Sequence, residues 1–413
     1  MMKSIHKTLL LLITLMLGAG ETALAQESFL PDDTNPALLY WREFAVMPEV
    51  NSKRVEELSN SAAITTDYLD FVTKFDATFR RLSKVRRFTG DCDWGDDLDE
   101  GPYLLLPYLS KARNVAKVAQ LRARIHFENG ENLKAVDELL SVYTLGGHIA
   151  NSPILINLLV HYSIDRICAA IIAENLSLLS TESLRKLKDG MNASPKGKTI
   201  ADTILTERHF MAGWLRSQLN KLTLESSNDH NATFTKAEHL IRQMFDTKSS
   251  DKVWADFQAA GGTSVERLIE LLDRSDTDYE ALESLCRKPN AEFLDQIAQF
   301  DQDSAKSSNP VRRWLFPSLA QSRTKEIGNR VLNEMVMTAI HSRLDGESAF
   351  NHSKDPIGGG AFKKSSFIHE RENVGFILES KFTDSKERHH LFLLRPLRGL
   401  NLSGPDLGTK IGD

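Results

Sequence analysis

The stretch from residue 91 to residue 100 concentrates carboxylates that could bind a cation. Its acidic residues are Asp91, Asp93, Asp96, Asp97, Asp99 and Glu100. No basic residue lies among them, and Ca²⁺, which takes roughly six to eight oxygen ligands, suits them chemically. The spacing of a calcium-binding loop does not fit, because Gly95 occupies its fifth position and Pro102 its twelfth. Two alternatives therefore stay open: a calcium site, and a loop whose carboxylates are solvated or paired with the arginines of residues 80–87.

A second group of polar residues interrupts a predicted helix, residues 152–175, that is apolar nearly all round. Asn157, His161 and Asp165 follow at intervals of four residues, and Cys168 comes three residues later. At about 1.5 Å rise per residue, His161 and Cys168 lie about 10.5 Å apart, too far for the proton transfer of a cysteine hydrolase. His161 and Asp165 can bind a metal ion with ligands from elsewhere. Because buried polar groups normally have local partners, we expect instead a structural, hydrogen-bonded pair.

Other catalytic motifs are incomplete or missing. Gly197-Lys198-Thr199 matches the end of a phosphate-binding loop, but Asn192 stands where that motif needs glycine, and no strand is predicted before it. Thr199 is instead expected to begin the following helix. The patterns H-E-x-x-H, G-x-S-x-G and G-x-G-x-x-G do not occur. The sequence therefore assigns no catalytic residue and no cofactor, with calcium as the one open possibility.

The charge balance argues against nucleic acid as a partner. The 413 residues include 51 Lys and Arg against 56 Asp and Glu, a formal charge of −5. Proteins that bind nucleic acid usually carry a basic surface that neutralises phosphates. The basic residues at 80–87 are more typical of a solvated helix face when the net charge is negative.

The first residues have the features of an export signal. Lys3 and Lys7 precede an apolar run at residues 9–17, and Ala23-Leu24-Ala25 follows as a typical cleavage motif. We expect cleavage before Gln26 and an exported protein, periplasmic or secreted. The run is shorter than the roughly 20 residues of a lasting membrane span, so no span is expected after cleavage.

The cysteines add little to this expectation. Cys92, Cys168 and Cys286 are odd in number and widely spaced. They form neither a disulfide framework nor a C-x-x-C motif. One disulfide with a leftover thiol stays open.

Hydrophobic periodicity predicts a mainly α-helical fold, an irregular bundle or solenoid with a small C-terminal β element. Apolar residues make up 41% of the chain and charged residues 26%, as in an ordinary globular protein. Apolar residues recurring every three or four positions predict helices at about 36–47, 51–88, 102–129, 153–174, 180–190, 199–222, 234–247, 250–260, 263–273, 277–300 and 310–344. Short strands are predicted around 366–369, 375–380 and 391–394.

These elements suggest three segments. Residues 1–25 are the signal peptide, 26–345 a helical domain and 346–413 a small β-containing segment. Polar stretches near 226–231 or 301–309 offer possible boundaries within the helical domain.

One helical hairpin resembles a tetratricopeptide-type unit. The stretch 123–130 ends a helix at Gly130, and Ala135, Leu139 and Val142 begin the buried face of the next helix. A glycine turn followed by a small packing residue is typical of that unit. The pattern does not recur at the 34-residue period, whereas a true array needs about three repeats.

The C-terminal motifs resemble the small β module of pseudopilin-like proteins, which also ends many uncharacterised exported helical proteins of bacteria. The motif runs from Asp355-Pro356-x-Gly358 through Phe362 to Gly375-Phe376-x-Leu378-x-Ser380. The opening at residues 35–41 and the turn at residues 92–95 are similar to the same exported proteins. The resemblance implies no established activity.

Two functional classes are compatible with these observations. The first is an exported, non-catalytic helical scaffold that binds another envelope or secreted protein. The alternative is an exported metal-dependent hydrolase that uses the loop 91–100 or the His161–Asp165 pair. The two differ in whether carboxylates or imidazoles converge in one cleft.

Overall fold

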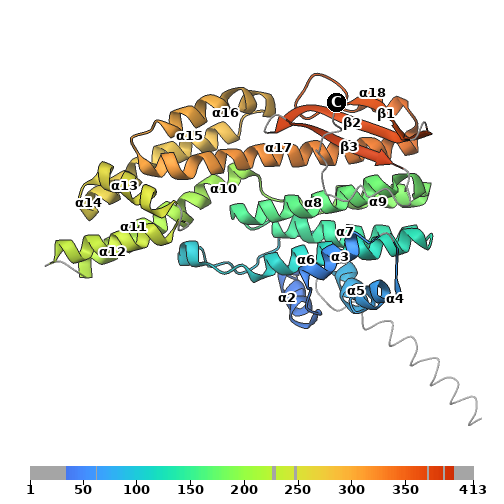
Figure 1. Cartoon of the computed structure of the whole chain (residues 1–413), viewed down its shortest axis with the longest axis horizontal. Helices are drawn as coiled ribbons and strands as arrows, with labels where there is room; N and C mark the ends of the chain where they lie inside the picture. Colours follow the sequence, from blue (N-terminus) through green and yellow to red (C-terminus); the bar gives the residue numbers. More distant parts are fainter. Residues whose placement is uncertain are drawn as a thin grey trace, which may run out of the picture. The chain divides into compact units, whose positions relative to one another are not determined.

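The computed structural model separates a second unit, which begins at Pro36, from the residues before it. It describes residues 34–61, 63–225, 229–245, 249–369, 372–384 and 387–394. The predicted signal peptide, residues 1–25, lies outside the described residues. The second unit contains both the helical part and the C-terminal strands (Figure 1).

The predicted fold class is confirmed: the described residues are mainly helical and include a small sheet near the C-terminus. The α-helices are α2 (Pro36–Val46), α3 (Ser52–Ser59), α4 (Thr66–Thr73), α5 (Asp76–Val85), α6 (Pro107–Glu128), α7 (Asn132–Ile149), α8 (Leu155–Asn175), α9 (Thr181–Ala193), α10 (Ile200–Glu207), α11 (Trp214–Glu225), α12 (His230–Gln243), α13 (Ser250–Gly261), α14 (Val265–Arg274), α15 (Asp276–Cys286), α16 (Asn290–Ala305), α17 (Pro310–Asp345) and α18 (Ser348–His352). The shorter helical turns are η1 (Leu98–Tyr103), η2 (Leu176–Leu178) and the π-helical η3 (Arg208–Gly213). The strands are β1 (Lys363–His369), β2 (Glu372–Asp384) and β3 (Glu387–Leu394).

Helix α8 lies at the centre of this unit, between α7 and α17 (Figure 1). Its apolar side chains point in nearly every direction, which is typical of a helix covered on all sides. By length and composition the segment Leu155–Leu178 could cross a membrane, but 56% of its apolar stretch is buried inside the fold. The observed surroundings therefore suit a core helix.

Helices α6 and α7 form the predicted hairpin. Gly130 has a φ of 72°, a left-handed conformation that favours glycine and turns the chain between the two helices. Ala135 is fully buried where α7 passes α6, and a small side chain there lets the helices approach closely.

Two buried glutamates fix the beginnings of central helices. Glu207 accepts a hydrogen bond of 2.8 Å from the backbone N–H of Leu155, the first residue of α8. Glu326 of α17 accepts one of 3.3 Å from Ile200, the first residue of α10. A carboxylate satisfies the unpaired N–H groups of a helix N-terminus and complements its dipole. Burial nevertheless raises the pKa of Glu207.

The two predicted linkers are short connections between helices. Residues 226–228 lie outside the described residues, and α12 begins directly afterwards at His230. In the second stretch, α16 continues through Ala305, and only residues 306–309 connect it to α17. Asn309 ends this connection by capping α17, since its side chain accepts a hydrogen bond from the N–H of Val311.

The C-terminal strands form an antiparallel sheet in the order β1-β2-β3. The sheet packs on α17 and α8 (Figure 1). The pairing shifts at Phe367/Ile368 and between Glu379 and Thr383, which marks an irregularity in each pair of strands. Leu378, Phe382 and Leu391 are fully buried and form the apolar face against the helices.

Asp355 holds the glycine-rich turn before the sheet. Its Oδ2 accepts hydrogen bonds of 2.8 Å from the hydroxyl of Ser380 and from the backbone N–H of Lys381 in β2. Its Oδ1 accepts one of 3.1 Å from the N–H of Ile357. The sequence motif Asp355-Pro356-x-Gly358 therefore joins a turn to the middle of the sheet.

Replacing Asp355 by asparagine is expected to lower the free energy of unfolding by about 1–2 kcal/mol. Both carboxylate oxygens of Asp355 accept hydrogen bonds, whereas the asparagine side chain has an NH₂ group in place of one oxygen. At least one of these hydrogen bonds is therefore lost. Urea unfolding of Asp355→Asn and of the exposed control Lys354→Ala measures the difference. Equal stability of both variants would contradict this role.

Candidate functional site

The buried carboxylate of Asp165 lies at the contact between α8 and α17. Its side chain is completely shielded from solvent. Oδ2 accepts hydrogen bonds of 2.9 Å from the side-chain amides of Asn329 and Asn333, one turn apart on α17. The carboxylate thus joins two helices that are separated by more than a hundred residues of sequence.

His161 lies next to this carboxylate without bonding to it. Its Nδ1 is 3.5 Å from Asp165 Oδ1, and within the described part of the chain neither atom has a hydrogen-bond partner. The ring packs against α7 at Gly146, where an added Cβ would lie 3.1 Å from Nδ1. The amide oxygen of Asn329 and the hydroxyl of Tyr162 are also buried without a partner among the described residues. The expected His161–Asp165 hydrogen bond is therefore not formed, and the partners of Asp165 come from α17.

Cys168 is not arranged as a nucleophile. It is buried, and burial raises the pKa of its thiol, which keeps the sulfur protonated. Its nearest hydrogen-bond acceptor is the carbonyl oxygen of Leu139, 3.9 Å from Sγ. Cys92 and Cys286 are likewise buried and free, so the three cysteines of the chain form no disulfide.

The acidic loop is attached to the helical core through Asp96 and Trp94. Asp96 Oδ2 accepts hydrogen bonds from the hydroxyls of Tyr108 and Ser152, at 2.8 and 2.9 Å. The ring of Trp94 stacks on that of Tyr108 with centroids 4.2 Å apart, and its indole N–H donates to the carbonyl oxygen of His148. One carboxylate and one aromatic ring of the loop therefore have structural roles.

The four weak metal candidates of this loop are exposed: Asp91, Asp93, Asp97 and Asp99. Asp93 and Asp97 each accept a hydrogen bond from a backbone N–H two residues later, as in turns. Asp99 Oδ1 lies 3.2 Å from His209 Nε2 of the π-helical segment. In the ranges that the structure describes, no group of three or more His, Cys, Asp or Glu side chains could hold a metal ion.

Two of the arginines that the sequence suggested as partners of this loop, Arg81 and Arg86, form ion pairs elsewhere. Arg81 binds Glu43 of α2 through two nitrogens, and Arg86 binds Asp137 of α7. Thr199 caps α10 in a reciprocal arrangement with Asp202, which confirms that Thr199 begins the following helix.

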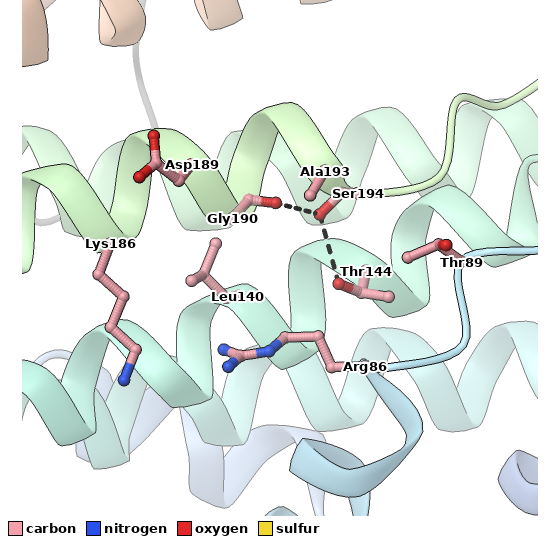
Figure 2. Close-up of a pocket in the computed structure, with 9 residues that line it drawn as sticks. All are labelled: Arg86, Thr89, Leu140, Thr144, Lys186, Asp189, Gly190, Ala193 and Ser194. Atoms are coloured by element: carbon pink, nitrogen blue, oxygen red, sulfur yellow. Dashed lines mark hydrogen bonds between the residues drawn. The ribbon is translucent and has the colours of Figure 1, made fainter.

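A groove of about 420 Å³ opens where the end of α5 meets α7 and α9 (Figure 2). Its lining residues are Arg86, Thr89, Leu140, Thr144, Lys186, Asp189, Gly190, Ala193 and Ser194. Thr144 and Ser194 lie 3.3 Å apart on facing helices, and Ser194 also donates to the carbonyl oxygen of Gly190 (Figure 2). The groove therefore combines two cations, one carboxylate, three hydroxyls and the apolar side chains of Leu140 and Ala193.

Glycines set the close packing of α7 and α9 beside this groove. A Cβ on Gly190 would lie 2.4 Å from a methyl group of Leu140, and one on Gly147 would lie 2.4 Å from the carbonyl oxygen of Pro195. The groove was not predictable from a sequence motif, because Arg86 and Lys186 are a hundred positions apart and belong to no motif. The two glycines were the available signal, since glycine inside a helix often marks a close approach.

Comparison with known proteins adds no relative. No family model matches the chain, and neither the curated proteins nor the solved structures contain a match. The tetratricopeptide-like and pseudopilin-like resemblances therefore stay predictions.

Proposed function

We propose that this chain is an exported, non-catalytic helical scaffold that binds another envelope or secreted protein. The observation that carries the proposal is the groove between α5, α7 and α9, with Arg86 and Lys186 at one end and hydroxyls at the other. At about 420 Å³ it matches the smaller ligand sites of proteins, which run from roughly 300 to 1,000 Å³. Such a volume suits a few side chains of a partner's segment.

The surroundings of the groove support a binding surface. Helix α7 is held on both sides, by α6 in the hairpin and by α8 in the core. Thr144 and Ser194 are buried and bonded to each other, so the floor of the groove is preformed. A preformed surface loses little conformational entropy on binding, which favours affinity.

Export, a periplasmic or secreted location and a partner in the same compartment are parts of this proposal. They are supported by the sequence features of residues 1–25. The tetratricopeptide-like character of α6 and α7 is a further part, supported by Gly130 and Ala135.

Photo-crosslinking in intact cells tests the proposal. A benzophenone amino acid at Thr89 or Ala193, both exposed in the groove lining, is expected to capture one defined protein. The matched control is Glu182, exposed on the same helix α9 but outside the lining. The groove positions are expected to give about fivefold more adduct than the control, because interface positions cluster around a few central residues.

Cell fractionation completes this experiment. The adduct is expected in the envelope or secreted fraction, with the chain beginning at Gln26. Equal crosslinking at Glu182, or an intact chain confined to the cytoplasm, would contradict the scaffold proposal.

A further inference from the structure

We infer that the groove binds an acidic segment of the partner protein, with a partner carboxylate taking the place of Asp137 between Arg86 and Lys186. This inference rests on the proposed scaffold function and deepens it by naming the chemistry of the partner.

The carboxylate of Asp137 forms ion pairs with both cations of the groove. Arg86 Nη1 lies 3.0 Å from Asp137 Oδ1, and Lys186 Nζ lies 2.7 Å from Asp137 Oδ2. Within the described residues, the Nε and Nη2 atoms of Arg86 have no acceptor, although a guanidinium can donate five hydrogen bonds. Arg86 therefore retains donors for the partner carboxylate that takes the place of Asp137.

These charges are accessible to a partner. The side chains of Arg86, Lys186 and Asp137 are 29%, 36% and 36% exposed. Exposed ion pairs are weak, so exchange of one carboxylate for another costs little. Asp137 is not itself among the lining residues, and the carboxylate of Asp189, the one acid among them, points away from both cations (Figure 2).

The neighbouring charges favour an acidic ligand over a basic one. Residues 80–87 contain five basic residues and no acid, and they lead directly into the groove at Arg86. Arg81 is paired with Glu43, and Arg80, Lys84 and Arg87 are exposed. A local cluster of one sign attracts segments of the opposite sign and accelerates their association. Leu140 adds an apolar floor against which the stem of a glutamate can lie.

Fluorescence anisotropy of a labelled oligoglutamate peptide with the purified protein tests this inference at low salt. Lys186→Gln is expected to weaken binding by about tenfold, because it removes one of the two cations that hold the carboxylate. Asp137→Asn is expected to strengthen binding by about threefold, because the internal competitor loses its charge. The matched control Arg185→Gln removes an equal charge from an exposed neighbour on α9 outside the lining and is expected to change binding by less than about twofold.

Three outcomes would overturn the inference. They are equal weakening by Arg185→Gln and Lys186→Gln, equal binding of an oligolysine peptide, and displacement of the peptide by inorganic phosphate at the same charge concentration. Unfolding midpoints of all three variants confirm that each is folded.

The crosslinking experiment separates this inference from the scaffold function. If the adduct at Ala193 forms equally well in Lys186→Gln, the scaffold function is supported and the inference of an acidic partner segment is contradicted. If no groove position captures a protein in the unmodified chain, the scaffold function itself falls.

Discussion

Replacing Asp165 by alanine is expected to lower the free energy of unfolding by about 3–5 kcal/mol, more than any other substitution proposed for this protein. The substitution leaves the amides of Asn329 and Asn333 buried without their acceptor. Each unsatisfied buried donor costs about 1–3 kcal/mol, and the removed side chain adds a small cavity. Urea unfolding at neutral pH measures the difference, with the exposed Asp189→Ala on α9 as control.

A double-mutant cycle separates the hydrogen bond from the cavity. Asp165→Ala combined with Asn329→Ala is expected to cost less than the sum of the two single changes, because both partners are then removed together. His161→Ala is expected to cost less than Asp165→Ala, since no hydrogen bond joins the two side chains. If the two substitutions lower the free energy of unfolding additively, the hydrogen bond between Asp165 and Asn329 does not stabilise the contact between α8 and α17.

The same variants test the alternative of a metal-dependent hydrolase. If His161 and Asp165 held a metal ion, added zinc or calcium would stabilise the protein, and either substitution would abolish that gain. The structural role predicts an unfolding midpoint that neither metal nor chelator changes. A midpoint that rises with metal and falls after either substitution would favour the hydrolase.

The location of α8 was predictable from the sequence, and the partners of Asp165 were not. Apolar residues around the whole helix predict a central position, and the structure places it there. Asn329 and Asn333 stand on a helix 164 and 168 residues further along the chain. Periodicity describes one helix at a time, so it cannot indicate which distant helix supplies a hydrogen-bond donor.

Helix boundaries show the same division between local and distant information. The predicted helix 277–300 is two helices, α15 and α16, because Pro289 cannot continue the first and stands at the start of the second. That signal is local and readable from the sequence. The predicted helix 199–222 contains the π-helical turn η3, and Trp214, the residue directly after it, packs against Gly101 of the η1 turn. Nothing in its own sequence indicates η3, which accompanies contacts with this distant segment.

The candidate site was predicted only in part. The chemistry of Asp91, Asp93, Asp97 and Asp99 was read from their types, but their exposure follows from the way Asp96 and Trp94 attach the loop. The groove depends on packing between α5, α7 and α9, which the sequence does not encode in one segment. Residues that meet only through tertiary packing carry no common spacing.

Acidification is expected to destabilise the protein through His148. This side chain is fully buried on α7, with Nδ1 2.9 Å from the hydroxyl of Tyr40, and Nε2 has no hydrogen-bond partner among the described residues. Burial lowers the pKa of His148 to about 4 from an ordinary value of 6.5. Between these values the unfolded chain binds a proton that the folded chain excludes. The stability contributed by the neutral ring is therefore complete above about pH 6.5 and is lost as the pH falls towards 4, at about 1.4 kcal/mol per pH unit.

The asparagine variant of His148 isolates this contribution. Asparagine keeps a polar atom near the Tyr40 hydroxyl but does not titrate. The free energy of unfolding of His148→Asn is therefore expected to approach that of the unmodified protein by about 2 kcal/mol between pH 7 and pH 4.5.

His126 acts in the opposite direction, because its hydrogen bond with Glu138 raises its pKa and stabilises the fold at low pH. His126→Gln is accordingly expected to steepen the acid destabilisation. Urea unfolding at pH 7, 6, 5 and 4.5 measures these slopes, and a constant difference between the unmodified protein and His148→Asn would show that the buried ring does not exclude the proton.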